Sequence, residues 1–192
     1  MRRQVGNVKF LGSFDEEIPD IPLPEVAFAG RSNVGKSSAL NTLLRSKKAA
    51  RVSGRPGRTQ RINLFQVGTS CVFADLPGYG FARVPQAVRD RWKPMIEGYL
   101  GGRQQLRLVV VLVDCRRDPQ ELDLTLVRGL SNAQIPYVVV ATKSDKLKKR
   151  EKKLVYQRLS GAYPGHCELV LFSSETGEGR DAVWDVIEKY CA

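Results

Sequence analysis

The sequence predicts an α/β fold, with a mostly parallel sheet of six strands, one antiparallel edge and helices on both faces. Short runs rich in Val, Ile, Leu and Phe alternate along the chain with longer segments whose apolar residues recur at helical spacing. Two of the short runs, 106–114 and 135–142, are almost continuously apolar, as expected of parallel strands that are covered on both faces. Strands that alternate with helices imply right-handed crossovers and therefore a mainly parallel sheet.

The size and charge of the chain narrow the functional classes. Its 192 residues are the length of one ordinary domain, so we expect residues 1–192 to form a single domain. It contains 31 Lys and Arg against 20 Asp and Glu, and the net charge of +11 favours polyanionic partners such as nucleic acid. No apolar run approaches the ~18 residues of a membrane span, and the start, MRRQVGNVKFLGSFDEE, lacks the apolar stretch of a secretory signal. The four cysteines are widely spaced. These features predict a cytoplasmic protein that does not associate with membranes.

The elements are expected in the following order. Residues 1–24, which end in IPDIPLPE, form an appendage before the first strand, 25–29. A glycine-rich turn then leads into the helix 36–48. The runs 61–67 and 70–76 are separated by two turn residues, which predicts an antiparallel hairpin. The remaining predicted elements are the strands 106–114, 135–142 and 168–173 and the helices 86–100 (kinked at Pro94), 119–130, 146–160 and 181–190.

In open sheets of this kind, ligands bind at the carboxyl ends of the strands, and the first such end carries a phosphate-binding motif. GRSNVGKS matches GxxxxGK[ST] between a strand and a helix, which predicts a P-loop NTPase fold. Its glycines let the backbone wrap around phosphates and present N–H groups at the positive end of the helix. Lys36 is expected to reach the β- and γ-phosphates, and Ser37 to ligate Mg²⁺. The predicted contacts are Gly30, Arg31, Ser32, Asn33, Val34, Gly35, Lys36, Ser37 and Ser38.

A second motif, DLPG, ends the strand run 70–76. Its aspartate can hold Mg²⁺ through the water shell of the metal, and the amide of its glycine can meet the γ-phosphate. Taken alone, DxxG is more often an ordinary turn. The predicted contacts are Asp75, Leu76, Pro77 and Gly78.

Two further motifs, TKSD and SSE, follow the last two predicted strands. A carboxylate at Asp145 can accept both the N1–H and the exocyclic amine of guanine, whereas adenine offers neither donor there. Lys143 can lay its aliphatic stem along the base, and the amide of Ser174 can donate to guanine O6. The predicted contacts are Thr142, Lys143, Ser144, Asp145, Phe172, Ser173 and Ser174.

The order of the four motifs is more informative than any one of them. Phosphate loop, DxxG, [NT]KxD and SS follow one another, each at the carboxyl end of a predicted strand. Since a coincidence of all four is far rarer than a coincidence of one, the sequence predicts a guanine-nucleotide-binding domain that takes GTP or GDP with Mg²⁺.

Between the first helix and the hairpin lies SGRPGRTQR, residues 53–61, which is rich in Gly and Arg. GTPases place in such a loop the threonine that completes the Mg²⁺ shell and senses the γ-phosphate. Thr59 is the candidate, because Thr42 falls within a predicted helix. The alternative is a solvated basic loop. The predicted metal ligands are therefore Ser37, Thr59 and Asp75.

Four stretches together resemble one family: GRSNVGKSSALN, GRPGRTQRINLF, DLPGYGFARV and TKSDK are similar to the EngB (YihA/YsxC) GTPases, which belong to the translation-factor-related class. The resemblance runs from about residue 5 to the C-terminus. It implies a role in assembly of the large ribosomal subunit and an association with cell division and septation. It also implies nucleotide contacts at 30–37, 57–61, 75–78, 142–145 and 172–174, which adds Gly57, Arg58, Thr59, Gln60 and Arg61.

Hydrolysis is expected to be slow. Ras-like proteins carry a water-orienting glutamine directly after DxxG, and here that residue is Tyr79, a weak replacement. The residues predicted to assist catalysis are Lys36, Thr59, Gly78 and Asn33. In related potassium-dependent GTPases an asparagine at the place of Asn33 helps bind K⁺, so we expect stimulation by K⁺. The alternative is that Asn33 only hydrogen-bonds within its loop.

Basic residues concentrate in KLKKREKK, residues 146–153, and in the arginines of the 51–61 segment. Contact with ribosomal RNA is one interpretation of both groups, and a solvated helix face is an equally weighted one for 146–153. The expected partners are guanine nucleotide and the large ribosomal subunit, bound by a monomer. The alternative function is an RNA- or protein-binding module that senses guanine nucleotide with negligible turnover.

Overall fold

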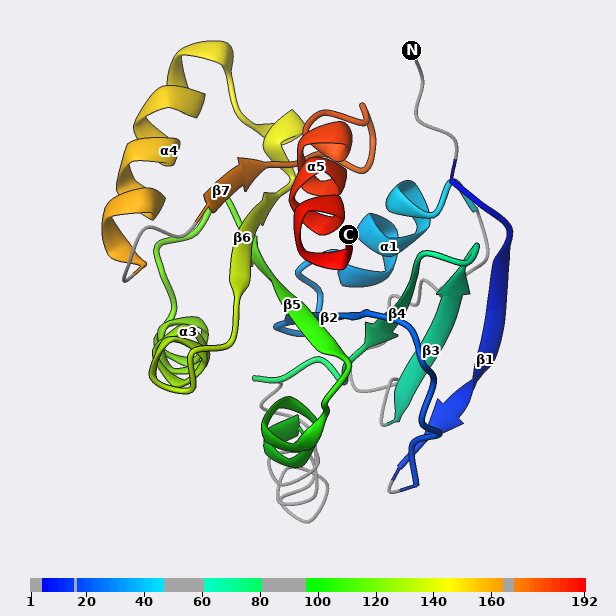
Figure 1. Ribbon diagram of the computed structural model, residues 1–192. Coiled ribbons are helices and arrows are strands. Elements are labelled where there is room, and N and C mark those ends of the chain that lie inside the picture. Colours follow the sequence, from blue (N-terminus) through cyan, green and yellow to red (C-terminus); the bar gives the residue numbers. More distant parts are fainter. Residues whose placement is uncertain (1–4, 16, 47–60, 81–95, 164–167) are drawn as a thin grey trace.

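The computed structural model describes residues 5–15, 17–46, 61–80, 96–163 and 168–192. Within these residues seven strands form one sheet in the order β1-β3-β4-β2-β5-β6-β7 (Figure 1). The strands are β1 (Val8–Phe14), β2 (Glu25–Gly30), β3 (Ile62–Val67), β4 (Cys71–Asp75), β5 (Leu106–Asp114), β6 (Tyr137–Thr142) and β7 (Glu168–Leu171). The helices are α1 (Lys36–Leu43), α3 (Glu121–Asn132), α4 (Lys149–Ala162) and α5 (Arg180–Cys191), with a 3₁₀ turn η1 (Ser144–Lys146) and a helical segment at 96–102.

The sheet is mostly parallel, as predicted. The pairs β2–β4, β2–β5, β5–β6 and β6–β7 are parallel, whereas β3 is antiparallel to both β4 and β1. Six strands therefore run in one direction and β3 alone runs against them. The predicted hairpin is confirmed as β3 and β4, but β3 is not the edge strand, because β1 covers it.

The seventh strand corrects the prediction of six. β1 lies inside the segment 1–24 that was expected to be an appendage, and it pairs with β3 from Val8 opposite Val67 to Phe14 opposite Ile62. Its side chains show no regular alternation of buried and exposed positions, and a register shift falls between Phe10 and Gly12. A half-exposed, bulged edge strand lacks the period of two by which strands are predicted.

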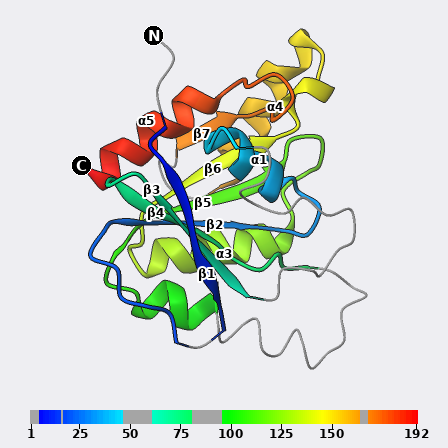
Figure 2. The same cartoon turned by 90° about the vertical axis from the view of Figure 1, so that its right-hand side faces the viewer.

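Helices cover both faces of the sheet, as predicted (Figures 1 and 2). One core lies under α1 and α5 and includes Leu40, Leu43, Val183 and Ile187. The other core lies under α3, α4 and the 96–102 segment. Residues 81–95, with most of the predicted helix 86–100 and Pro94, lie outside the described residues.

A buried acid joins the start of β2 to the 96–102 segment. Glu25 is fully buried, and its carboxylate accepts hydrogen bonds from Arg103 at 2.6 and 2.9 Å and from Tyr99 Oη at 2.7 Å. A charge in that position is tolerable only because it is paired and hydrogen-bonded. Burial, followed by the charge of Glu25, raises the pKa of Tyr99.

Helix α5 fixes the far end of α1. Arg180 Nε donates to Thr42 O at 3.0 Å, and Trp184 Nε1 donates to Leu43 O at 3.2 Å. These donors bind carbonyls of the last turn of α1, one of which, Thr42 O, also accepts from Arg45 N at 3.3 Å, and the guanidinium complements the negative end of the helix dipole. Since α1 begins at the phosphate-binding motif, α5 helps to hold that motif in place.

Replacing Gly179 by Ala is expected to destabilise the fold by about 3 kcal/mol. Gly179 precedes α5 with φ 75°, and a Cβ there would lie 2.0 Å from Leu171 O, a backbone atom that cannot turn away. Urea unfolding followed by circular dichroism would measure the loss. Gly161→Ala in α4 is the matched control: its Cβ would meet nothing within 4 Å, so a small gain from helix propensity is expected. Equal stabilities of the two variants would contradict this prediction.

Candidate nucleotide-binding site

Strand β2 ends at Gly30 and leads through a tight loop into α1, whose N-terminus is open to an anion. Gly35 caps the helix with φ 101°, a conformation that glycine adopts at low cost, and within the part of the chain that the structure describes α1 has no side-chain cap hydrogen bond. The first turn of α1 contains no acidic residue, whereas α3 begins with Glu121 and Asp123. The free N–H groups and the positive end of the helix dipole therefore both suit a phosphate.

Close packing fixes the loop before α1. A Cβ at Gly30 would lie 2.9 Å from Leu112 O in the neighbouring strand, so only glycine is accommodated there. Asn33 has φ 65°, a left-handed conformation that asparagine tolerates better than most residues. Val34 is buried, and Ser37 and Ser38 lie in the first turn of α1.

The lysine of the loop and the aspartate of DLPG are joined. Lys36 Nζ forms a buried ion pair with Asp75 Oδ1 at the end of β4, and only 7% of Lys36 and 3% of Asp75 are exposed. Leu76 and Pro77 continue the buried chain from there. The predicted phosphate lysine and the predicted metal-binding aspartate therefore lie side by side.

The residues after DLPG run along the phosphate loop. Ser32 N donates to Tyr79 O at 2.9 Å, Tyr79 N donates to Gly30 O at 3.3 Å, and Gly78 O lies 3.3 Å from Ser32 Oγ. The Tyr79 hydroxyl donates to Asp123 Oδ1 of α3 at 2.8 Å. Burial, then the carboxylate of Asp123, raises the pKa of Tyr79 well above its usual value. Tyr79 is therefore a neutral phenol that is directed toward α3.

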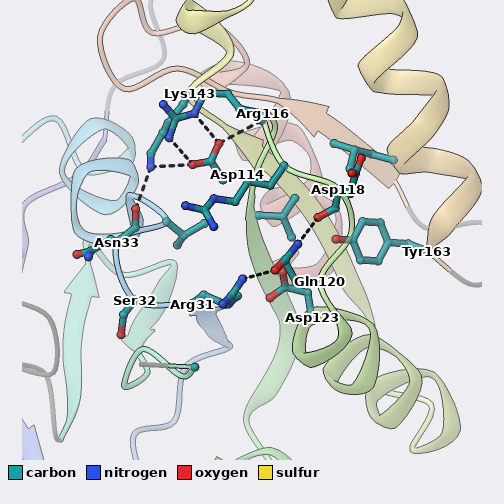
Figure 3. Close-up of a pocket in the computed structure, with 15 residues that line it drawn as sticks. Arg31, Ser32, Asn33, Asp114, Arg116, Asp118, Gln120, Asp123, Lys143 and Tyr163 are labelled. Carbon is teal, nitrogen blue, oxygen red and sulfur yellow. Dashed lines mark hydrogen bonds and ion pairs between the residues drawn. The ribbon is translucent and has the colours of Figure 1, made fainter. Parts of the chain in front are cut away.

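The TKSD segment contacts the phosphate loop directly. Thr142 Oγ1 lies 2.7 Å from Val34 O and 3.0 Å from Val113 O. Lys143 Nζ donates to Asn33 O and to Asp114 Oδ2 (dashed lines in Figure 3), and both distances are 2.9 Å. Two carbonyls of the phosphate loop thus fix the position of the segment that follows β6.

The carboxylate expected to recognise guanine is held by the last loop of the sheet. Ser173 Oγ donates to Asp145 Oδ1 at 2.8 Å, and Lys146 Nζ lies 3.1 Å from Asp145 Oδ2. The hydrogen bond from Ser173 is the main reason that the pKa of Asp145 lies below its usual value. Asp145 is therefore an anion at neutral pH. Ser144 N donates to Phe172 O at 3.1 Å, so the two predicted base-binding segments are in contact.

Part of the predicted site is not described. Gly57, Arg58, Thr59 and Gln60 lie outside the described residues. Arg61 is described, but its side chain pairs with Asp15 near β1, with Nε 2.9 Å from Oδ1, and is 61% exposed.

Known proteins share the sequence that builds this site. Residues 25–143 match the family described as "50S ribosome-binding GTPase". The "Probable GTP-binding protein EngB" of Syntrophus aciditrophicus is 50% identical over 171 residues, which are 89% of this chain and 87% of that protein. The chain belongs to the EngB family. The protein of the same description from Geobacter sulfurreducens is 47% identical over 184 residues, 94% of this chain and 88% of that one.

Solved structures agree on the P-loop GTPase fold. A crystal structure of a probable GTP-binding protein engB superposes with a TM-score of 0.70 at 24% identity, covering 87% of this chain and 98% of that one. Era in complex with MgGDPNP and part of 16S ribosomal RNA superposes with a TM-score of 0.72 at 22% identity, covering 88% of this chain and 57% of that one. No helix among the described residues is long and apolar enough to cross a membrane.

The residues of this EngB-family chain that could hold Mg²⁺ are oxygen donors. Ser37 and Asp75 offer a hydroxyl and a carboxylate, the hard ligands that Mg²⁺ prefers. Over the described ranges, no group of three or more His, Cys, Asp or Glu could hold a metal ion by itself. Mg²⁺ sites of nucleotide-binding enzymes take their other ligands from substrate phosphates and water.

Two side chains that hold the site were not predicted. Asp114, at the end of β5, binds Lys143, and Glu178 accepts from Ser144 Oγ and Lys152 Nζ, both at 2.6 Å. Asp114 could have been found by applying the strand-end rule to β5. Glu178 had no sequence signal, because its partners come from α4 and from the TKSD loop.

Beside this framework lies a polar cavity of about 390 Å³ (Figure 3). Arg31 and Asn33 line it from the phosphate loop, and Asp114 and Lys143 from the ends of β5 and β6. Arg31 Nη1 donates to Gln120 Oε1 at 2.8 Å, which joins the loop to the start of α3. The cavity therefore shares Lys143 and the residues from Arg31 to Val34 with the predicted nucleotide contacts.

Asp114→Asn is expected to lower stability by about 1–2 kcal/mol at pH 7. Partial burial, the largest single influence, favours the neutral acid, but hydrogen bonds from Arg116 and Lys143 outweigh it and hold the pKa of Asp114 well below its usual range. A carboxyl group whose pKa is lower in the folded state than in the unfolded state stabilises the fold at any pH above the unfolded-state pKa of about 3.9. This stabilisation is lost as the pH falls from there through the folded-state pKa. The difference between wild type and variant should therefore shrink below about pH 4.

Urea unfolding from pH 7 to pH 3 would test this. Asp118→Asn is the control, since Asp118 is 79% exposed and its pair with Arg158 should contribute less than about 1 kcal/mol. A constant gap between wild type and Asp114→Asn across this pH range would contradict the prediction.

Proposed function

We propose that this chain is a GTP-hydrolysing switch that acts on the large ribosomal subunit during its assembly. It binds GTP with Mg²⁺, acts as a monomer in the cytoplasm, and is linked through its family to cell division and septation. Membership of the EngB family and the match to 50S ribosome-binding GTPases support the nucleotide and the particle.

The observation that carries the proposal is the direct link between the base-reading and phosphate-binding segments. Thr142 and Lys143 bind the carbonyls of Val34 and Asn33 within the phosphate loop. A purine and its phosphates are covalently joined through one ribose, so a site for both must hold the two segments at a separation that this ligand can span. These contacts do that with the chain's own atoms.

Each motif then has a role. Loop N–H groups and Lys36 bind the phosphates, Asp145 accepts from the guanine edge, and the stem of Lys143 lies along the base. Mg²⁺, when bound through Ser37, Thr59 and the water held by Asp75, supplies charge neutralisation at the phosphates. The backbone amide of Gly78 contacts the γ-phosphate, and Thr59 responds to its presence.

Slow turnover follows from Tyr79. A neutral phenol that donates its proton to a hydrogen bond with Asp123 of α3 is a poor general base. A group supplied by a partner can accelerate such a reaction by ~10⁵, which leaves the ribosomal particle room to regulate it. The same observation favours one alternative, a guanine-nucleotide sensor with negligible turnover.

Calorimetry and phosphate release test the proposal together. GDP and GTP should bind with measurable heat, ADP and ATP should not, and phosphate release should rise when large subunits are added. Sedimentation with ribosomal fractions in GTP-analogue, GDP and nucleotide-free buffers should show binding that depends on the nucleotide. Absence of heat with GDP would refute the proposal, and absence of turnover with large subunits would favour the sensor.

Potassium dependence is a separate expectation. We propose that Asn33, at the exposed turn of the phosphate loop, helps bind K⁺ beside the phosphates. Single-turnover hydrolysis should therefore be faster in KCl than in NaCl, and the difference should be lost in Asn33→Ala. Equal wild-type rates in the two salts would refute this role.

A further inference from the structure

Helix α4 lies at the β7 side of the sheet and directs most of its surface outward (Figure 1). Leu159 is its one fully buried residue among the fourteen from Lys149 to Ala162. Leu154 and Tyr156 are 67% and 44% exposed. A helix that needs so little of its surface for packing has a large face available to a partner.

Apart from Lys148, the N-cap residue of α4, the cations near the helix fall into two groups. Three form ion pairs with acidic residues of the same chain: Lys146 pairs with Asp145, Lys152 with Glu178, and Arg158 with Asp118. Lys149, Arg150 and Lys153 are exposed and form no ion pair with any residue that the structure describes.

These three cations share one side of the helix. At 100° per residue, Arg150 lies 180° from Leu159, the buried residue nine positions later. By the same count Lys149 and Lys153, one turn apart, lie about 80° and about 120° from Leu159, so the three cations fall within one sector of about 100°. The acid between them, Glu151, accepts a hydrogen bond from Lys148 N at 2.7 Å and so belongs to the helix cap. We call Lys149, Arg150 and Lys153 the α4 basic surface.

We propose that the α4 basic surface binds the phosphate backbone of RNA. Adjacent unpaired cations complement a regular row of phosphates, and such contacts supply most of the affinity for nucleic acid. The exposed Leu154 and Tyr156 on the same helix add apolar contact with sugars and stacking with an unpaired base. The proposal deepens the proposed function and rests on it for the identity of the RNA, which is that of the large ribosomal subunit.

The first measurement is binding of the full chain, with GDP present, to a fluorescently labelled RNA stem-loop. Anisotropy titrations between about 50 and 200 mM KCl should give an affinity that falls steeply with salt. The triple variant Lys149→Gln, Arg150→Gln, Lys153→Gln should bind at least about tenfold more weakly. Its slope of log affinity against log salt should be shallower by about 2 to 3, one for each lost phosphate contact.

A matched variant separates a local contact from a loss of net charge. Lys9→Gln, Arg107→Gln, Lys189→Gln removes the same three charges from exposed positions on β1, β5 and α5. It should retain the wild-type slope. If both triple variants lose affinity equally, the effect is one of overall charge and the α4 basic surface is refuted.

Two further outcomes bear on the proposal. Calorimetry with GDP should give wild-type affinity for the α4 triple variant, so its RNA defect is not a folding defect. Wild-type binding to the RNA-free proteins of the large subunit, lost in the α4 triple variant, would show a protein partner and refute RNA. If the wild type binds GDP but no RNA at low salt, this inference fails and the proposed nucleotide-binding function stands.

Discussion

Replacing Asp145 by Asn is expected to lower the affinity for GDP at least about 100-fold and to shift the preference to xanthosine diphosphate. The carboxylate, an anion whose pKa is lowered by the hydrogen bond from Ser173, would accept two hydrogen bonds from guanine. Each bond to a charged group contributes about 1.5–3 kcal/mol. An Asn side chain keeps one acceptor and offers one donor, which pairs with the N1–H and O2 of xanthine instead.

The fold should survive this change. The amide introduced by Asp145→Asn can still accept from Ser173 through its carbonyl oxygen, and the side chain of Asp145 is 12% exposed, so no buried group loses all its partners. Calorimetry with GDP, XDP and ADP would measure the preference, and thermal unfolding would check the fold. Asp185→Asn, at an exposed position on α5, is the control and should leave all three affinities unchanged. If Asp145→Asn bound GDP as tightly as the wild type, the proposed contact between Asp145 and guanine would be refuted.

The fold was predictable wherever burial leaves a recognisable pattern of apolar residues in the sequence. Six of the nine positions of β5 and five of the six of β6 are buried, so their apolar runs identified them. β1 was missed because it is half-exposed and shifted in register. α4 begins at Lys149 rather than 146, because the chain first passes through Lys143 at φ 65° and the turn η1, which together place Asp145. Helix-forming residues could not reveal this requirement.

The motifs of the candidate site were predictable from the sequence, but the side chains that hold the motifs together were not. Phosphate loop, DLPG and TKSD each contain the atoms for one part of a nucleotide, and the strand-end rule brings them to one edge. Which side chains hold the motifs together depends on packing between distant segments. Asp114 lies 29 residues from Lys143, and Glu178 lies 34 residues from Ser144. A motif describes local chemistry, and such pairs are non-local.

Lys36→Met is expected to abolish measurable GTP turnover and to weaken GTP binding by at least about 100-fold. Removal of the ammonium group loses the proposed charge on the β- and γ-phosphates, where charge develops during transfer. The same change should also destabilise the fold by about 3 kcal/mol, because Asp75 would become a buried carboxylate without its cation. Loss of binding by this variant alone would therefore have two explanations.

A second variant distinguishes loss of the phosphate contact from loss of stability. In Lys36→Met, Asp75→Asn the buried charge is gone, and the remaining neighbour, Asn63, can donate to the new amide through Nδ2, which lies 3.5 Å from Asp75 Oδ2. Unfolding by urea should then return to within about 1 kcal/mol of wild type, since replacing both members of a buried pair costs far less than removing one. Nucleotide binding should stay lost, because nothing in the double variant replaces the phosphate cation. Recovery of GTP affinity together with stability would show that Lys36 serves only to neutralise Asp75, and the proposed phosphate role would be wrong.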